Sequence, residues 1–289
     1  MQPVVQMEAP SHIWTGPDGG ATLTLFKHDG LFHVSAPECC DFLIDAATRR
    51  VDVHSEPDVP TSTIEHLLID QVLPRCLAHD GDLVLHGAGV VIGDRAAVFL
   101  GESGHGKSTL TAMLQRLGCP ILSDDCLQLE ITGDGPRAWP TYPSLRLLPD
   151  MLDSLFPGAP MHLPLAGYSD KRRLPVAATA TSKGVPVDVV YILEPPDAGN
   201  TGVMIAEVTP GAAVLAVTRN LFKLDPTDLT RAAALLAKTA TVVRSTRVFS
   251  LRYPREITAL PSYAAAIIRH VAPDSTMSGL KPVGTINTA

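Results

Sequence analysis

The stretch GESGHGKSTLTAMLQRLGCPILSDD, residues 101–125, decides the fold and holds the residues with the clearest chemistry. Its first eight residues follow the pattern of a phosphate-binding loop (P-loop), with glycines at positions 101 and 106 followed by Lys107 and Ser108. Glycine permits the positive φ values that let backbone amides close around phosphate oxygens, and the positive end of the following helix points at the same anion. The apolar run Ala96–Leu100 predicts the strand that precedes such a loop. The stretch therefore predicts a site for a nucleoside triphosphate.

Within this loop, two side chains have predicted roles of their own. Lys107 has the reach to contact the outer phosphates and to act in catalysis, and Ser108 offers its hydroxyl to Mg²⁺. A glycine-rich turn between a strand and a helix is the alternative, which the flanking elements disfavour. The residues predicted to bind the nucleotide are Gly101, Ser103, Gly104, His105, Gly106, Lys107, Ser108 and Thr109.

An acidic pair follows the helix. Asp124 and Asp125 come 17 and 18 residues after Lys107, at the end of the short apolar run 120–123. A strand that returns beside the loop places its carboxyl end near the bound phosphates. One carboxylate then holds Mg²⁺, and the other accepts a proton from an attacking hydroxyl. Two exposed aspartates in a turn are the alternative.

A histidine precedes the loop on a neighbouring strand. The apolar segment 83–92 is joined to the strand 96–100 by Gly93-Asp94-Arg95, which is too short for a helical crossover, so we expect an antiparallel hairpin. His86 interrupts the first strand of this hairpin. If the hairpin places it beside Asp124, its imidazole can hydrogen-bond to that carboxylate; a structural histidine is the alternative.

Composition excludes several functional classes. The net charge of −7 disfavours nucleic-acid binding, which needs a basic surface. No apolar run approaches the about 18 residues of a membrane span, and the first residues lack the pattern of a signal peptide. The five cysteines are scattered without metal-ligand spacing, as in reduced cytosolic proteins. We therefore expect a cytoplasmic protein that contacts neither membrane nor nucleic acid.

The pattern of apolar residues predicts an α/β chain of three parts. Residues 1–80 contain short alternating strands and then a helical linker over 61–79 that Pro74 divides. Residues 81–275 form the P-loop domain, with a buried strand over 185–193 and helices over 227–240 and 261–272. Residues 136–164 are expected to be irregular because they are rich in proline, and 276–289 form a flexible tail.

The set of His86-Gly87, the loop 101–108 and Asp124-Asp125 resembles the kinase domain of the HPr kinase/phosphorylase family. The resemblance is strongest over 83–131, weaker to about 193, and absent from the N-terminal region. It implies the phosphoenolpyruvate-carboxykinase-like P-loop fold, with a mixed sheet, and ATP with Mg²⁺ as cofactors. By position, it implies that Asp124 is the catalytic base, that His86 is the partner of this base, and that Asp125 joins Ser108 on the metal side. The order within the acidic pair stays open.

The chain also departs from that family. The glycine- and arginine-containing motif linked to phosphorylase activity is missing downstream of the acidic pair, which argues against phosphorolysis and against HPr as the substrate. The segments 142–147 and 171–175 are similar to those of HPr-kinase-like proteins found with natural-product gene clusters. Among these, the lasso-peptide tailoring kinases phosphorylate the C-terminal serine of a precursor peptide.

Basic residues are predicted on the acceptor side of the site. Arg146, Lys171 and Arg172 are candidates for contacts with phosphate or substrate, with a solvated surface cluster as the alternative. Arg219 and Arg252 are further candidates, and for each of them a structural role is favoured over a catalytic one.

The sequence therefore predicts a kinase that transfers the γ-phosphoryl group of ATP to a serine hydroxyl on a peptide or small protein, with a lasso-peptide precursor as one candidate. A nucleotide-sensing regulatory protein and a kinase of a free hydroxylated metabolite are the alternatives. HPr kinases form rings, but a motif does not carry this property over to another chain, and a homo-oligomer stays an open alternative here.

Overall fold

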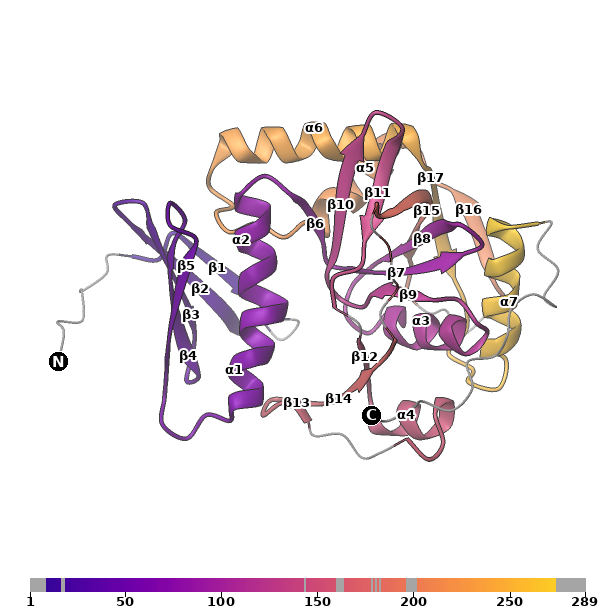
Figure 1. Ribbon diagram of the computed structural model, residues 1–289, viewed down its shortest axis with the longest axis horizontal. Coiled ribbons are helices and arrows are strands. Elements are labelled where there is room, and N and C mark those ends of the chain that lie inside the picture. Colours follow the sequence, from indigo (N-terminus) through magenta and orange to yellow (C-terminus); the bar gives the residue numbers. More distant parts are fainter. Residues whose placement is uncertain are drawn as a thin grey trace.

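The computed structural model is a mixed α/β fold (Figure 1). It describes residues 9–16, 19–142, 144–159, 164–177, 179, 181, 183–195 and 202–273. The predicted α/β class, with a mixed sheet behind a β-rich N-terminal region, is confirmed. The predicted tail at 276–289 lies outside the described residues.

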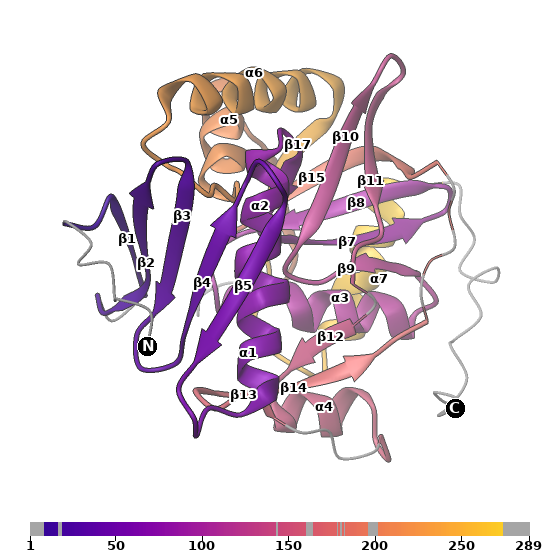
Figure 2. The same cartoon turned by 60° about the vertical axis from the view of Figure 1, so that its left-hand side comes forward.

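Five antiparallel strands form the N-terminal sheet, in the order in which they occur in the chain. They are β1 (His12–Thr15), β2 (Ala21–His28), β3 (Leu31–Ala36), β4 (Cys40–Asp45) and β5 (Arg50–Ser55). Because side chains alternate along a strand, Leu25 and Phe42 point to one face and are fully buried there against Leu67 and Val72 of the next segment. Figure 2 shows these strands side by side in front of a helical column.

That column is the predicted helical linker, and Pro74 divides it as expected. It consists of α1 (Thr61–Leu67), one π-helical turn η1 (Leu68–Val72) and α2 (Leu73–His79). Proline has no backbone N–H, so Pro74 cannot donate to the carbonyl of Asp70 four residues earlier. The amide of Leu73 instead donates to the carbonyl of Leu68, five residues back, which is the π-helical pattern.

A second, nine-stranded sheet forms the centre of the molecule. Its strands are β6 (Leu83–Leu85), β7 (Gly87–Ile92), β8 (Arg95–Leu100), β9 (Ile121–Ser123), β10 (Leu127–Thr132), β11 (Gly135–Trp139), β15 (Val185–Leu193), β16 (Met204–Glu207) and β17 (Arg247–Arg252). The sheet is mixed: β15 runs parallel to β8 and β17 but antiparallel to β11. The strand predicted over 185–193 is confirmed at those bounds.

Helices cover both faces of this sheet. They are α3 (Lys107–Arg116) and α7 (Leu260–Val271) on one face, and α5 (Pro210–Arg219) and α6 (Leu229–Ser245) on the other (Figure 1). Within β8, Phe99 packs in the cluster of α3 and α7, whereas Val98 packs in the cluster of α5 and α6. Burial on both faces explains why β8 reads as a continuous apolar run. The predicted helices over 227–240 and 261–272 correspond to α6 and α7.

The predicted hairpin before the loop is confirmed, since β7 pairs antiparallel with β8. The segment 83–92 is not one strand, however, because β6 ends before His86 and pairs with β10. β7 is also antiparallel to β9, so β8 and β9 run in the same direction. Their carboxyl ends, Leu100 and Ser123, therefore lie at one edge of the sheet, where the loop and the acidic pair follow them.

A three-stranded sheet lies next to this edge. It consists of β12 (Ser144–Leu147), β14 (Ser169–Pro175) and β13 (Pro164–Ala166), and the helix α4 (Pro149–Leu155) follows β12. The prediction that residues 136–164 are irregular is therefore wrong for β11, β12 and α4. These elements are short and are separated by prolines, so no period develops in the sequence. The turn between β13 and β14 contacts the helical column, where the amide of Gly167 donates to Thr63 Oγ1 at 2.8 Å.

The predicted division into domains at residues 80 and 81 stays a prediction. The N-terminal sheet is separate from the central one, but Leu224, which follows α5, is buried in the N-terminal core. None of the helices in the described part of the chain combines the length and the apolar character needed to cross a bilayer.

Candidate functional site

The loop between β8 and α3 has a backbone that requires glycine. Gly101, Gly104 and Gly106 have φ values of 148°, 83° and 94°. Gly106 is also the residue that begins α3, and a Cβ there would overlap the hydroxyl of Tyr253, which donates to the carbonyl of Gly106 at 2.9 Å. The side chain of Arg255 donates to the carbonyl of Gly104. The loop is therefore held from outside, with its amides near the start of α3 as an anion site requires.

Lys107 is buried and its ammonium group is turned into the loop. Its Nζ donates to the carbonyl of Gly101 at 2.6 Å and to that of Glu102 at 3.2 Å. Burial lowers the pKa of Lys107, and the nearby charges of Asp125 and Asp124 act in the opposite direction. The ammonium group is thus held beside the glycines by carbonyl contacts, and phosphate oxygens are stronger partners for it.

The remaining predicted loop residues surround this lysine. His105 Nδ1 lies 3.0 Å from the carbonyl of Leu193 at the end of β15. Ser103 is exposed on the loop, and Thr109 lies in the first turn of α3. The eight residues predicted to bind nucleotide therefore lie on one loop and one helix start, and their role stays a prediction.

Asp124 connects the acidic pair to this loop. Ser108 donates its hydroxyl to Asp124 Oδ1 at 3.0 Å, and the backbone amide of Arg146 donates to Oδ2 at 3.0 Å. The residue is 0% exposed. Burial and the neighbouring charge of Asp125 raise the pKa of Asp124 to about 6. Each carboxylate oxygen therefore accepts a hydrogen bond within the protein, one from the Ser108 hydroxyl and one from the backbone of Arg146.

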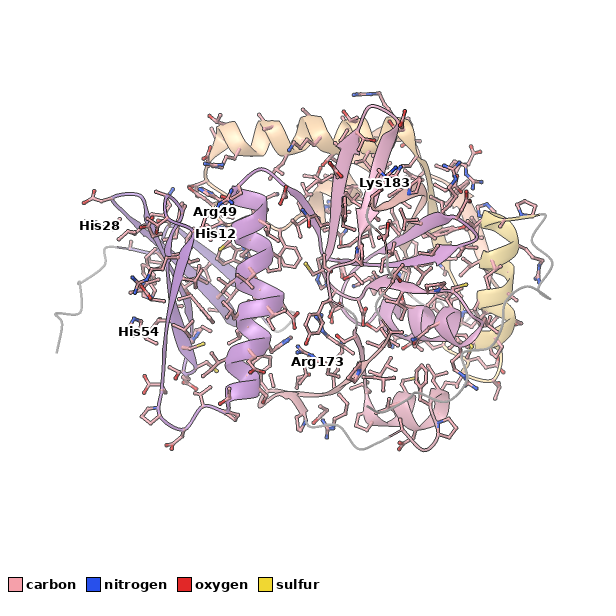
Figure 3. The ribbon with its side chains drawn as sticks, viewed as in Figure 1. His12, His28, Arg49, His54, Arg173 and Lys183 are labelled. Atoms are coloured by element: carbon pink, nitrogen blue, oxygen red, sulfur yellow. The ribbon has the colours of Figure 1, made fainter. Side chains whose placement is uncertain are left out.

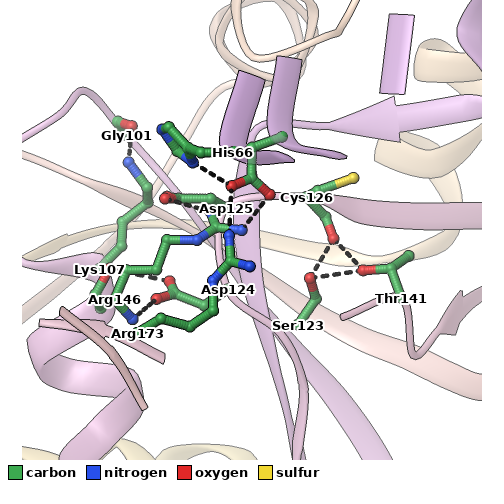
Figure 4. Close-up of polar contacts among 12 residues, drawn as sticks. His66, Gly101, Lys107, Ser123, Asp124, Asp125, Cys126, Thr141, Arg146 and Arg173 are labelled. Atoms are coloured by element: carbon green, nitrogen blue, oxygen red, sulfur yellow. Dashed lines mark hydrogen bonds and ion pairs between the residues drawn. The ribbon is translucent and has the colours of Figure 1, made fainter. Parts of the chain in front are cut away.

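Asp125 faces a different partner. Arg146 Nη1 donates to Asp125 Oδ2 at 2.6 Å, and 20% of the Asp125 side chain is exposed (Figure 4). Burial acts to raise the pKa of Asp125, but the positive charges of Arg146 and Lys171 outweigh it and hold the pKa well below its usual range. Its φ of 74° turns the backbone so that the two neighbouring carboxylates point to different partners. Asp125 is the more accessible member of the pair.

Sequence reasoning missed Asp70, the third carboxylate of this site. Asp70 lies in η1, is 3% exposed, and accepts from Arg146 Nη2 at 2.5 Å and from Arg173 Nη2 at 3.3 Å. His66 Nδ1 lies 2.5 Å from Oδ2 of Asp70, the same oxygen that Arg173 contacts. The only local signal in the sequence was the spacing of His66 and Asp70, two polar residues four apart on the helical column.

Because side chains alternate along a strand, the basic residues on β12 and β14 point to two different faces of the small sheet. Arg146 is 1% exposed and contacts Asp125 and Asp70 within the protein, so its predicted contact with phosphate or substrate stays a prediction. Lys171 and Arg173 lie on one face of β14: the charge of Lys171 acts on Asp125 and Lys107, and Arg173 contacts Asp70. Arg172 lies on the opposite face and donates to the carbonyl of Asp170 at 2.6 Å. The predicted contact of Arg172 with phosphate or substrate stays a prediction. Arg173, which was not among the candidates, lies opposite Arg146.

Arg173 also has an aromatic contact. Its guanidinium carbon lies 4.7 Å from the centre of the Tyr142 ring, and Nη1 donates to the Tyr142 hydroxyl at 2.7 Å. Figure 3 shows Arg173 between α1 and the strands of the small sheet. The two further candidates lie in other elements: Arg219 ends α5 and Arg252 ends β17.

His86 lies in the bend between β6 and β7. Its amide donates to the carbonyl of Asn220 at 2.7 Å, and its ring meets Phe222 edge-on with ring centres 6.0 Å apart. Burial lowers the pKa of His86, and the charge of Asp125 acts to raise it. Within the described residues, no hydrogen bond joins His86 to Asp124, the partner predicted for it. Asp125 is the carboxylate whose charge reaches this histidine.

The arrangement fits a Mg²⁺–nucleotide. Ser108 and Asp124 supply one hydroxyl and one carboxylate, which suits Mg²⁺ because this ion keeps several waters and binds through one or two carboxylates together with substrate phosphates. Among the described residues, no group of three or more His, Cys, Asp or Glu side chains forms a metal cage.

Comparisons with known proteins add little to this geometry. No protein-family model matches the sequence, and no curated protein matches it significantly. One solved structure that matches is the HPr(Ser) kinase/phosphatase from Coxiella burnetii, with 13% sequence identity over 65% of this chain and 94% of that chain, and a TM-score of 0.32. A likeness at this TM-score decides neither the fold family nor the function.

Proposed function

We propose that this chain is an ATP- and Mg²⁺-dependent kinase that transfers the γ-phosphoryl group to a serine hydroxyl on a peptide or small protein. The observation that carries the proposal is the hydrogen bond from Ser108 to Asp124, which joins a P-loop-type loop to an acidic pair. A loop alone binds phosphate. A loop with one carboxylate on its metal side and a second, accessible carboxylate next to it has the parts needed for phosphoryl transfer to a hydroxyl.

We assign the two aspartates in the order opposite to that implied by the resemblance. Asp124 is the metal-side carboxylate, because it is fully buried and already contacts Ser108. Asp125 is the residue that accepts the proton of the acceptor hydroxyl, because its side chain is partly exposed, with the charges of His86 and Lys171 acting on it. Considered by itself, the raised pKa of Asp124 favours Asp124 as the base. A base must first be able to reach the hydroxyl of the substrate, however, and its pKa is the second criterion.

A low pKa at Asp125 is compatible with this role. The transition state of phosphoryl transfer is loose in most analyses, so the attacking hydroxyl loses its proton late and positioning matters more than basicity. Ser108 and Asp124 would hold Mg²⁺, which would supply positive charge to neutralise the charge that develops on the phosphate oxygens. Lys107, Lys171 and Arg146 supply positive charge from the protein around the same region.

The proposal of a peptide as acceptor rests on the resemblance of segments 142–147 and 171–175 to those of HPr-kinase-like proteins. Of peptide acceptors, a C-terminal serine of a lasso-peptide precursor is the specific candidate. Its test is to incubate the purified chain with Mg-ATP and a set of serine-containing peptides, including ones that end in serine, and to measure peptide mass. The expected result is a gain of one phosphoryl group on a peptide, absent for Lys107→Ala.

Two other outcomes separate the alternatives. Phosphorylation of free serine or another hydroxylated metabolite, with no peptide modified, identifies a small-molecule kinase. Saturable Mg-ATP binding without transfer to any acceptor identifies a nucleotide sensor. Retained binding and turnover in Lys107→Ala contradicts the site itself.

The order of the acidic pair has its own test. Asp125→Asn is expected to lower the rate of transfer about 10³-fold, to a residual rate that is still measurable, and to leave Mg-nucleotide affinity within about threefold, because it removes only the acceptor-side group. Asp124→Asn is expected to weaken the Mg²⁺ dependence of nucleotide binding. The reverse pattern restores Asp124 as the base.

A further inference from the structure

Among the described residues, the carboxylate of Asp70 is the least exposed acidic group outside the predicted site, and it is surrounded by cationic and imidazole groups. Oδ1 accepts from Arg146 at 2.5 Å, while Oδ2 lies 3.3 Å from Arg173 and 2.5 Å from His66. A carboxylate buried to this extent is stable as an ion only with such partners. Nothing in the proposed roles of the loop or the acidic pair accounts for it.

The fold brings Asp70 to the site by a specific irregularity. Asp70 lies in the π-helical turn η1, whose i to i−5 hydrogen bond follows from the missing amide of Pro74. Asp70 is 76 residues away from Arg146 in the chain, on the helical column that belongs to the N-terminal region. The contact therefore joins that region to the phosphotransfer edge of the central sheet.

Arg146 is the group on which Asp70 acts. Its guanidinium is planar and forked, so each of its two ends can hold one carboxylate. Nη2 holds Asp70 and Nη1 holds Asp125, while the backbone amide of the same residue holds Asp124. With one end fixed by Asp70, the other end is aimed at Asp125. One arginine thus determines the relative positions of three carboxylates.

We propose that Asp70 is a positioning residue of the phosphotransfer site: it fixes the guanidinium of Arg146, and through it the carboxylate of Asp125, so that the N-terminal region completes the site. This inference rests on the proposed function. Asp70 touches neither nucleotide nor acceptor in this scheme, so its effect falls on the rate of transfer rather than on nucleotide binding. Misplacement of a catalytic group by about 1 Å costs about 10²-fold in rate.

The kinetic experiment uses the full chain, Mg-ATP as the probe and water as the acceptor, with release of inorganic phosphate as the readout. Asp70→Asn is expected to lower kcat about 10²-fold and to change the KM for Mg-ATP less than threefold. The matched control is Asp225→Asn, which removes a carboxylate with 8% side-chain exposure that pairs with Lys27 away from the site. This control is expected to retain kcat. A kcat for Asp70→Asn within threefold of the wild type overturns the proposal.

A double-variant cycle separates positioning from general damage. If Asp70 acts through Asp125, then Asp70→Asn has no further effect on the rate in an Asp125→Asn background. An equal effect in both backgrounds overturns the proposal. If Asp70→Asn does not fold, Arg146→Lys takes its place, because a lysine keeps the charge but cannot bridge two carboxylates. That variant is expected to show the same loss of kcat, and near-normal turnover overturns the proposal.

A spectroscopic experiment tests the same contact without any activity. In ¹⁵N spectra of arginine side chains, the guanidinium of Arg146 is expected to give resolved, slowly exchanging Nη–H signals, assigned by their loss in Arg146→Lys. Asp70→Asn is expected to broaden them, and Asp225→Asn is not. Unchanged signals in Asp70→Asn overturn the positioning role even if the chain is a kinase. Broadened signals in a chain that neither binds nor turns over Mg-ATP support the contact and refute the proposed function.

Discussion

Arg146 and Arg173 lie directly opposite each other on the antiparallel strands β12 and β14, and both contact the single carboxylate of Asp70. Like charges at directly opposed positions destabilise a sheet. Here the carboxylate lies between them, and Tyr142 accepts a hydrogen bond from the second guanidinium. The small sheet next to the site is therefore stabilised by a side chain from a different part of the chain.

Arg146 is expected to be essential for stability as well as for chemistry. Arg146→Met leaves Asp70 and Asp125 without their shared cation at a residue that is 1% exposed. Removing one member of a buried ion pair costs about 3–5 kcal/mol. Denaturant unfolding should show a loss in this range. Arg247→Gln is the control, because Arg247 pairs with Asp188 at the surface and such pairs contribute about 0–1 kcal/mol.

Gly106→Ala is expected to distort the loop. A Cβ at this position overlaps the hydroxyl of Tyr253, and the φ of 94° is itself unfavourable for alanine by about 1–2 kcal/mol. Affinity for Mg-ATP should fall at least about tenfold in an equilibrium binding titration. Gly106→Ala combined with Tyr253→Phe should recover part of the loss, because the overlapping oxygen is removed. No recovery in the double variant contradicts the steric explanation.

The raised pKa of Asp124 predicts a pH dependence of stability in the absence of Mg²⁺. Burial first, and then the charge of Asp125, raise this pKa from 3.8 to about 6. A carboxyl group whose pKa is higher in the folded state contributes stability below its unfolded pKa, and this contribution is lost as pH rises through the folded value. The free energy of unfolding of the wild type should therefore fall relative to that of Asp124→Asn between about pH 4 and 6. A constant difference across this window contradicts the assignment.

Strand alternation on β14 predicts opposite results for two adjacent residues. The charge of Lys171 acts on Asp125 and Lys107, whereas Arg172 points to the other face of the strand. Lys171→Met should lower the rate of transfer about 10²-fold, as expected for the loss of one group that stabilises developing charge. Arg172→Gln should stay within about twofold of the wild type. Equal losses in the two variants refute the alternation.

The parts of this fold that were predictable are those with local patterns. The run from Ala96 through the loop to α3 follows from apolar residues, glycines and a helix start that are adjacent in the chain. The strand β15 and the hairpin of β7 with β8 were found for the same reason. Short elements such as β12 do not extend far enough to show a period, so they were not found.

The parts of the site that escaped prediction depend on long-range contacts. Asp70 has no local feature that assigns it to Arg146, and only the packing of the helical column against the small sheet brings the two together. The candidates on β14 were Lys171 and Arg172 and not Arg173, because the face to which each side chain points is unknown until the partner strand is known. His86 was placed near the acidic pair, but which aspartate faces it depends on the backbone turn at Asp125.

The shared carboxylate also has a consequence for the order in which the chain is made. Synthesis proceeds from the N-terminus at about 5–20 residues per second, and N-terminal units fold first. The helical column therefore exists before β12, and until Arg146 emerges the carboxylate of Asp70 has neither of its arginine partners. A nascent chain that ends before about residue 175 does not yet contain the whole of β14 and cannot complete this cluster. The contacts of the phosphate loop with Tyr253 and Arg255 form later still, so the site is complete only after the last strand of the central sheet has been made.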